Sequence, residues 1–367
     1  MGSLKERKQN GRARLRDLGI TIGTYPVGRH NAITDVPGVL VGQKTCIADT
    51  PHTIRTGLTV IRPRNGKIHD DYPFAGVFSF NGVGEMTGIP LIEEWGVLTS
   101  PIVLTNTDQV GMARDALARF GSTIQGDGFA YKLGVVAETY DGVLNDIDKF
   151  ALTEQDVLEA MEKASSGPVA EGNVGGGTGM TCYDFKGGIG TSSRIVTFDE
   201  RKYTIGVLVQ ANHGSRHHLV VDGVPVGREL PAQKIPTPGR SGKDLSSIIV
   251  IIATDAPLLP GQCKRLARRA TIGMARTGGV GCDTSGDIFL CFATGNHYDP
   301  HEKRRVIKLN MLHQDQMDPM IEATTEAVEE AILNALTAAE TMVGYKGHTA
   351  YALPLEELKA IMSKYRP

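Results

Sequence analysis

The segment that most constrains the fold is an unbroken run of apolar, β-branched residues, Ile248 to Ile252. A run without alternating polar positions is typical of a strand that is buried on both faces. The polar stretch Arg240 to Asp244 and the pair Ser246-Ser247 come directly before it. The sequence therefore places two hydroxyl groups where a polar turn enters a buried strand.

The rest of the chain predicts further strands and two groups of helices. Apolar runs bounded by glycine predict strands at 38–42, 58–61, 75–80, 205–209, 219–221 and 288–292. Apolar residues at helical spacing predict helices over about 108–120, 153–167 and 260–277. A last helix is expected from Asp318, its N-cap, through Pro319 to Gly344. This pattern indicates an α+β protein, with sheets layered against helices in a single domain spanning 1–367.

Length, charge and cysteine content narrow the class of protein. A chain of 367 residues can bury a large core without disulfides. Its formal net charge of −2 gives no electrostatic case for nucleic acid or an anionic membrane, and no run approaches a membrane-spanning helix. Residues 1–16 are polar and basic, which predicts a disordered tail. Five cysteines without CxxC spacing favour a reduced, cytoplasmic protein: Cys46, Cys182, Cys263, Cys282 and Cys291.

Ser247 is the first candidate nucleophile. A hydroxyl fixed by a strand can attack the carbonyl just before it, and hydrolysis of the resulting ester would free a new α-amine. That amine, with a reference pKa of about 7.7–8.0, could act as a base for the hydroxyl of the same residue. Serine pairs before strands are common, so this fragment alone does not identify a nucleophile.

Two further fragments carry suitable chemistry. Ser285 and Asp287 are two residues apart at the entry to a strand, so both side chains should share a face and could relay a proton. Asn212, at the end of another strand, offers an amide donor for a developing oxyanion. For each fragment taken alone, a turn-forming role is the more common explanation.

Other motifs point to no cofactor and no metal. The glycine-rich stretch 172–179 lacks the Gly-Lys-Ser/Thr ending of a P-loop and the GxGxxG spacing, so close backbone packing is the better interpretation. His217 and His218 are adjacent and would point apart on a strand, and no HExxH accompanies them.

Taken in order, these motifs closely resemble the β-aminopeptidase family, which includes the L-aminopeptidase/D-Ala-esterase/amidases. The resemblance covers most of the chain: Asn31 to Val39, Phe80 to Glu85, Glu138 to Asp146, Gly172 to Gly179, Gln210 to Gly214, Ser247 to Leu258 and Ser285 to Phe289. It implies an αββα sandwich, similar to Ntn hydrolases but with different connectivity. It also implies self-cleavage into two chains, 17–246 and 247–367, that remain together, commonly as a homotetramer.

The resemblance also implies roles for individual residues. Ser247 would be the nucleophile, Ser285 and Asp287 its proton-handling partners, and Asn212 the oxyanion donor. Tyr140 would supply an active-site hydroxyl. Glu138 first and Asp141 second would hold the substrate ammonium, and Asn81 would also line the substrate site. The expected activity is release of N-terminal L-, D- or β-amino acids from short peptides, amides and esters through an acyl-enzyme.

Two positions depart from the family pattern, and two other functions remain open. Ser246 stands where relatives often carry Gly, and Asp287 stands where some carry Glu. One alternative is an inactive relative retained as a binding or scaffold protein. The other is acyl transfer of the ornithine acetyltransferase type, against which the serine at 247 argues, because those enzymes use threonine.

Overall fold

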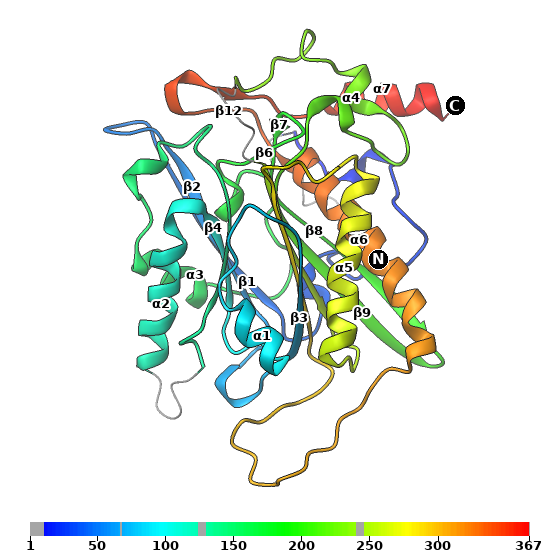
Figure 1. Cartoon of the computed structure of the whole chain (residues 1–367). Coiled ribbons are helices and arrows are strands. Elements are labelled where there is room, and N and C mark those ends of the chain that lie inside the picture. Colours follow the sequence, from blue (N-terminus) through cyan, green and yellow to red (C-terminus); the bar gives the residue numbers. More distant parts are fainter. Residues whose placement is uncertain (1–10, 67, 124–129, 240–245, 367) are drawn as a thin grey trace.

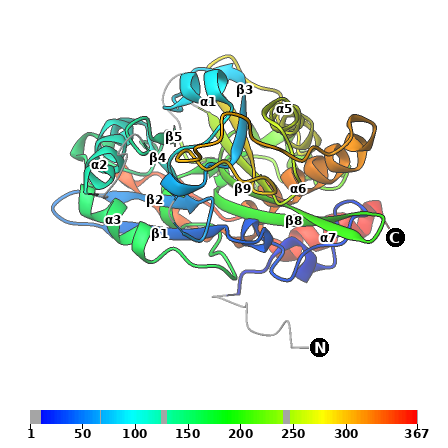
Figure 2. The same cartoon turned by 90° about the horizontal axis from the view of Figure 1, so that it is seen from below.

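Two β-sheets pack face to face, and each is covered by helices on its outer side (Figure 1). The structure is a computed structural model that describes residues 11–66, 68–123, 130–239 and 246–366. Viewed from below, the layers run from α2 (Val110–Ser122) and α3 (Glu154–Glu162) through the two sheets to α5 (Pro260–Arg276) and α6 (Met317–Ala338) (Figure 2). The predicted αββα sandwich is therefore confirmed.

The larger sheet has the strand order β3-β11-β10-β9-β8, and the smaller sheet has the order β1-β2-β4-β5. Two short hairpins, β6-β7 and β12-β13, stand apart from them. The strands are β1 Leu40–Ala48, β2 Ile54–Arg62, β3 Phe74–Gly82, β4 Ile102–Asn106, β5 Val135–Thr139, β6 Thr181–Cys182, β7 Phe185–Lys186, β8 Gly188–Phe198, β9 Arg201–Asn212, β10 Ser247–Thr254, β11 Gly286–Ala293, β12 Met342–Val343 and β13 Thr349–Ala350.

Helices α5 and α6 cover the larger sheet, whereas α2 and α3 cover the smaller one. No helix among the described residues is both long and apolar enough to cross a membrane. The helices are α1 Ile89–Trp95, α2 Val110–Ser122, α3 Glu154–Glu162, α4 Val226–Glu229, α5 Pro260–Arg276, α6 Met317–Ala338 and α7 Leu355–Tyr365.

Strand β10 lies at the centre of the larger sheet and is buried on both faces, as its sequence predicts. Ile248, Val250 and Ile252 belong to the core beneath α5 and α6. Ile249 and Ile251 belong to the core that fills the space between the sheets. Because side chains alternate along a strand, Ser247 shares the face of Ile249 and Ile251, toward the smaller sheet.

The glycine-rich stretch forms a wedge between the two sheets. Its 3-10 turn, Gly175–Gly177, contacts β2 and β4 on one side and β8 and β9 on the other. A Cβ on Gly176 would lie 2.0 Å from Oε1 of Gln210 and 2.8 Å from the Leu104 carbonyl oxygen. The stretch is thus packed backbone, in agreement with the sequence interpretation.

The start of the chain differs from the expected disordered tail 1–16. Residues 1–10 lie outside the described part, but the residues from Arg12 onward pack against α6. The Arg12 guanidinium donates to the Leu336 and Leu353 carbonyl oxygens, and the Leu15 amide donates to Asn334 Oδ1. The prediction of disorder is wrong for these residues, because long-range contacts fix them in a way that polar composition does not reveal.

The last long helix also differs from its predicted bounds. It begins at Met317, with Gln316 as N-cap, and ends at Ala338 because Ala339 is extended. The apolar Met342, which fits helical spacing, lies instead in β12 and pairs with β13. The strand predicted at 219–221 is absent: these residues follow a 3-10 turn and make only an isolated bridge, Val221 to Val224.

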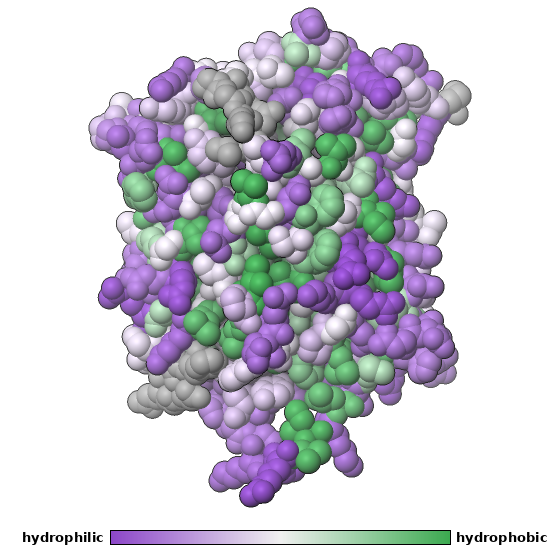
Figure 3. All heavy atoms as spheres, in the orientation of Figure 1, coloured by the Kyte–Doolittle hydropathy of each residue, from purple (hydrophilic) through white to green (hydrophobic). Residues whose placement is uncertain are grey.

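The connection between β11 and α6 projects from the body of the molecule (Figure 1). Its side chains include exposed apolar residues, with Val306 81% exposed. On the face in Figure 3, polar residues predominate at the outer edges, and apolar ones gather near the middle and on this projection.

Candidate active site

The predicted nucleophile lies where four strand ends of the larger sheet meet. Ser247, the first residue of β10, pairs with Asn212, the last residue of β9, and with Gly286, the first residue of β11. On the far side of β11, Asp287 pairs with Asn81 near the end of β3. The register therefore brings together residues that lie up to 206 positions apart in the sequence.

The hydroxyl of Ser247 lies against the peptide bond that precedes it. Its Oγ donates to the Ser246 carbonyl oxygen at 2.7 Å. The Gly286 amide lies within hydrogen-bond distance of that carbonyl oxygen, 3.2 Å, and of Ser247 Oγ, 3.1 Å. A backbone N–H is thus placed where it can polarise the carbonyl that the hydroxyl would attack.

A chain of hydrogen bonds leads from Ser246 into the interior. Ser246 Oγ donates to Ser285 Oγ at 3.1 Å, and Ser285 Oγ donates to Asp287 Oδ1 at 2.6 Å. Burial raises the pKa of Asp287, although bonds from Ser285, Asn81 and the Ile248 amide oppose the rise. The predicted pairing of Ser285 with Asp287 is therefore present, and it reaches Ser246 in the uncut chain.

Asn81 lies beside Asp287 and leaves neither amide hydrogen free. Its Nδ2 donates to Asp287 Oδ2 at 3.0 Å and to the Cys282 carbonyl oxygen at 3.2 Å. A register shift between Asp287 and Ile288 sets this pairing. Asn81 therefore supports the Asp287 carboxylate, and the substrate contact expected from the resemblance stays a prediction.

The side chain of Asn212 is fixed at both ends. Its Oδ1 accepts from the Thr181 amide at 2.8 Å, and its Nδ2 donates to the Tyr140 carbonyl oxygen at 3.0 Å. The side-chain amide carries two N–H groups, so one remains for a further acceptor. Asn212 neighbours Ser247 in the sheet, which suits the oxyanion role predicted for it.

Glu138, on β5 of the smaller sheet, comes close to the same strand ends. Its Oε1 accepts from the Glu85 amide at 2.9 Å, and its Oε2 accepts from the Thr107 hydroxyl. A Cβ on Gly84 would lie 2.9 Å from Gly286 Cα and 3.1 Å from Glu138 Oε1, so only this glycine separates the carboxylate from β11. Burial raises the pKa of Glu138.

Asp141 and Tyr140 have different surroundings. Asp141 is fully buried and accepts from Thr56 at 2.5 Å, Asn145 at 3.0 Å and Asn106 at 3.3 Å. Burial raises its pKa to about 6. These three donors already bond the Asp141 carboxylate, and its predicted contact with the substrate ammonium stays a prediction. Tyr140 is half-buried, with its ring against Gly142, and burial raises the pKa of its phenol.

His213, next to Asn212, is not suited to act as the base. Burial lowers its pKa to about 3. Its Nδ1 lies 3.7 Å from Cys182 Sγ, and its ring packs edge-on against Tyr183. The imidazole is therefore neutral at physiological pH and belongs to the core behind Asn212.

Three groups that contact the predicted site residues were not predicted from the sequence. The Gly286 amide is invisible in a sequence because it is backbone. Thr107 reaches Glu138 because β4 pairs in parallel with β5, and Thr181 reaches Asn212 through the β6-β7 hairpin. A predicted register for β4 and β5 could have pointed to Thr107. The predicted turn 240–244 lies outside the described residues.

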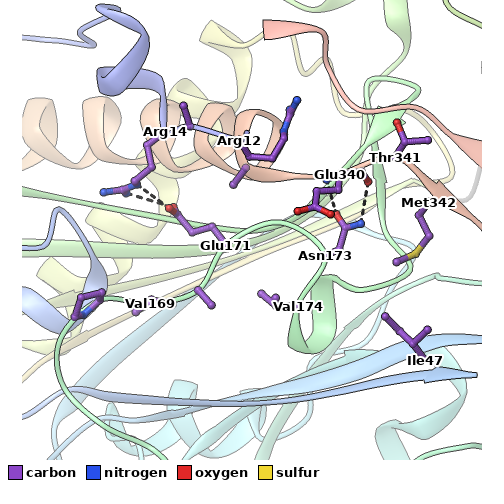
Figure 4. A pocket seen from close by; sticks show the side chains of 14 residues that line it. Arg12, Arg14, Ile47, Val169, Glu171, Asn173, Val174, Glu340, Thr341 and Met342 are labelled. Carbon is purple, nitrogen blue, oxygen red and sulfur yellow. Dashed lines mark hydrogen bonds and ion pairs between the residues drawn. The ribbon is translucent and has the colours of Figure 1, made fainter. Parts of the chain in front are cut away.

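A cavity of about 570 Å³ lies elsewhere, between the N-terminal segment, residues 168–174 and the end of α6 (Figure 4). In it, Arg14 pairs with Glu171, and the Asn173 side chain bonds the Glu340 backbone. The residues that line it do not include Asn212, Ser246, Ser247, Ser285 or Asp287.

Comparison with known proteins agrees with the resemblance seen in the sequence. Residues 31–350 match peptidase family S58. The β-peptidyl aminopeptidase BapA of Sphingosinicella microcystinivorans is 46% identical, over 96% of this chain and 92% of its own.

Two solved structures are also similar over nearly their whole length. A Burkholderia sp. β-aminopeptidase has a TM-score of 0.90 and 47% identity, covering 97% of this chain and 100% of its own. The L-aminopeptidase D-Ala-esterase/amidase of Ochrobactrum anthropi, described as a variant of the Ntn hydrolase fold, has a TM-score of 0.88 and 45% identity over 96% and 98%. The chain therefore belongs to peptidase family S58 and is an aminopeptidase with an Ntn-hydrolase-like fold.

Proposed function

We propose that the chain cuts itself between Ser246 and Ser247 and then works as an aminopeptidase through the new N-terminal serine. The observation that carries the proposal is the placement of the Ser247 hydroxyl 2.7 Å from the carbonyl oxygen of that bond. The Gly286 amide beside the same oxygen supports it, because charge that develops there would be stabilised.

The proposed cleavage balances within the chain and one water. Ser247 Oγ attacks the Ser246 carbonyl carbon, and the carbon–nitrogen bond breaks. Ser285 with Asp287 handles the hydroxyl proton, which ends on the departing Ser247 nitrogen, and an ester remains. Water then hydrolyses the ester, which yields a Ser246 carboxylate, a free Ser247 hydroxyl and a free α-amine. Departure of Ser246 releases the Ser285 hydroxyl for the new amine.

Turnover would reuse the same groups on a substrate. The neutral α-amine takes the proton of Ser247 Oγ, which attacks the substrate carbonyl and forms an acyl-enzyme. The remaining N–H of Asn212 stabilises the oxyanion, and Ser285 with Asp287 steadies the protonated amine. The leaving amine departs with a proton, and water releases the acid.

We infer that the substrate must carry a free N-terminal ammonium. Glu138 lies close to the strand ends that carry Ser247, since a Cβ on Gly84 would lie 2.9 Å from Gly286 Cα and 3.1 Å from Glu138 Oε1. The names of the relatives refer to β-peptides, L-amino acids and D-alanine esters or amides. Short peptides, amides and esters of such residues are therefore the substrates that we propose.

Mass spectrometry of the purified protein tests the cleavage. We expect fragments of 246 and 121 residues, the smaller beginning with Ser247. The Ser247→Ala variant should stay one chain and lose turnover by about 10⁶-fold, the loss typical of a serine nucleophile. An uncut wild-type protein with full activity would refute self-cleavage.

A panel of p-nitroanilides of L-Ala, D-Ala and β-Ala tests the substrate proposal. Each is assayed with and without N-acetylation, and the acetylated members should be refused. A charged hydrogen bond of about 1.5–3 kcal/mol corresponds to roughly 10- to 150-fold discrimination. Equal cleavage of acetylated members would instead indicate a general amidase.

We also propose that processed units assemble as a homotetramer in the cytoplasm. All five cysteines are free, which suits a reducing compartment. Light scattering of the processed protein tests the tetramer, and a monomer would refute it.

A further inference from the structure

A buried lysine lies behind Asn212 and has no place in the chemistry described above. Lys186, on β7, is fully buried. Its Nζ donates to three backbone carbonyl oxygens: Met180 at 2.7 Å, Gly187 at 2.8 Å and Gly177 at 3.1 Å. An ammonium has three N–H donors, so this geometry uses all of them.

These carbonyls belong to the segment that holds the oxyanion donor. Gly177 and Met180 frame the end of the glycine-rich wedge, immediately before β6. In the β6-β7 hairpin, Thr181 pairs directly with Lys186. The Thr181 amide is the donor that fixes Asn212 Oδ1. One buried ammonium therefore joins the wedge, the hairpin and the strand that follows.

The hairpin is also tied to the chain just beyond Asn212. The Tyr183 amide donates to the His213 carbonyl oxygen at 2.8 Å. Movement of the hairpin would therefore move both the side chain of Asn212 and the backbone beside it. An apolar residue at 186 would remove a charged donor from three buried carbonyl oxygens. The Gly177 and Met180 oxygens would keep only their backbone donors, the Met180 and Gly187 amides, and this loss favours rearrangement of the segment.

We propose that Lys186 is a positioning residue for catalysis: its ammonium fixes the wedge and the β6-β7 hairpin so that the Thr181 amide holds Asn212 toward the oxyanion. This rests on the proposed function, in which Asn212 is the oxyanion donor. Lys186 itself touches neither substrate nor nucleophile. Its effect on the rate passes through the side chain of Asn212, which makes the proposal testable by a double-mutant cycle.

The charge of Lys186 is sensitive to pH near neutrality. Burial lowers the pKa of Lys186 to about 7, opposed by the nearby Cys182 and Asp141. Above that pH the neutral amine keeps two N–H donors for three carbonyls, so the hold on Asn212 weakens. Asp141, whose pKa is about 6, is already ionised there. The Ser247 amine has the opposite effect, because it must lose its proton to act as a base.

Stability responds in the opposite direction from activity. The lysine pKa is lower in the folded chain than its ordinary 10.5, so the unfolded chain binds more protons between about pH 7 and 10.5. The Lys186 contribution to stability therefore rises with pH across this window, while the positioning effect falls. A merely structural lysine would not produce this divergence.

The experiment compares Lys186→Met and Lys186→Gln, each alone and combined with Asn212→Ala, as purified protein whose cleavage has been confirmed by mass. We expect Lys186→Met to lower kcat by about 10- to 100-fold with little change in KM, bounded by the roughly 10²–10³-fold loss expected for Asn212→Ala. Lys186→Gln, which keeps two donors, should fall between. In the Asn212→Ala background, both changes should alter kcat by less than about 3-fold.

Arg194→Gln is the matched control. Arg194 is another fully buried cation, paired with Glu326 and Glu330 against α6. Its loss should lower the melting temperature while leaving kcat unchanged. If Lys186→Met does not fold, the pH profiles of kcat decide: the ratio of wild-type kcat to Asn212→Ala kcat should fall above about pH 7, because the effect of the Ser247 amine is common to both proteins and cancels from the ratio.

Equal losses of kcat in the two backgrounds, or a ratio that stays constant above about pH 7, would overturn the positioning role. Full activity of Asn212→Ala would overturn it together with the oxyanion assignment. Sequencing of the smaller chain tests self-cleavage separately, so failure of that part is recognised independently.

Discussion

Replacing Asp287 by asparagine removes the charge at the end of the Ser246–Ser285–Asp287 chain while keeping its shape. The carboxylate accepts from Ser285 at 2.6 Å, from Asn81 at 3.0 Å and from the Ile248 amide. An amide keeps one acceptor oxygen and presents an NH2 group in place of the other. The oxygen must face Asn81, whose NH2 cannot accept, so the new NH2 faces Ser285 and the serine hydroxyl turns round to accept from it.

If the Ser285 hydroxyl turns in this way, Asp287→Asn should lose little stability but should cleave itself much more slowly. Ser285 and Asn81 both keep a partner, and replacing charged by neutral hydrogen bonds should lower the free energy of unfolding by only about 1–2 kcal/mol. The reversed Ser285 hydroxyl can no longer pass a proton toward Asp287. Loss of a positioned proton-transfer group typically slows a reaction by about 10²- to 10⁴-fold. Self-cleavage should slow by that factor.

The assay follows the uncut chain by intact mass from the time of synthesis, with thermal denaturation of the same sample. Asp283→Asn, an exposed carboxylate in the same loop, is the control and should be cut like wild type. Cleavage of Asp287→Asn within about 10-fold of the wild-type rate, in a folded protein, would show that the carboxylate takes no part in the proton transfer.

Three further outcomes are expected. Ser246→Ala removes the hydroxyl that occupies Ser285 in the uncut chain, so intact mass should show cleavage a few-fold faster, with unchanged turnover of the processed enzyme; slower cleavage would contradict this. Glu138→Gln should raise KM by about 10- to 100-fold with kcat nearly constant, because an ammonium contact is present in ground and transition states alike. Since burial raises the pKa of Glu138, wild-type KM should also rise as pH falls toward that pKa, and the variant should lack this rise. Gly176→Ala should lower the free energy of unfolding by about 1–3 kcal/mol in denaturant titrations, because its Cβ would overlap Gln210, whereas the open Gly111→Ala should raise it by about 0.4–1 kcal/mol.

The elements with strong local signals are predicted well from the sequence. The run from Ile248 to Ile252 predicts a strand buried on both faces, and β10 is such a strand. Thr153 predicts the start of α3, where its side chain forms a capping box with Asp156. The interpretation of the glycine-rich stretch as packed backbone also agrees with the structure. The sequence predicts these three features well because each depends on residues that are close together in the chain.

Features that depend on distant partners are predicted less well. Met342 fits a helical stripe, but its pairing with Ala350 places it in a hairpin. Asn81 belongs to a family motif, but only the register shift beside Ile288 shows that it supports Asp287. Composition cannot reveal that Arg12 reaches the carbonyls of Leu336 and Leu353. The sequence therefore indicates which residues carry suitable chemical groups, but it does not show how each side chain is oriented.

The order of strands in the larger sheet has a consequence for how a processed molecule survives heating. Cleavage before Ser247 would place β10 and β11 on the small chain, enclosed between β3 on one side and β9 on the other, both from the large chain. The fragments could then separate only by breaking both ladders, so dissociation and global unfolding would be the same event. Refolding would then be a bimolecular reaction between the two fragments, and its yield would depend on their concentration. The uncut Ser247→Ala chain, whose strands remain covalently joined, should refold with a yield that does not depend on its concentration. After cleavage, unfolding of a dilute sample would be effectively irreversible, so the lifetime of the processed protein would be set by its unfolding rate.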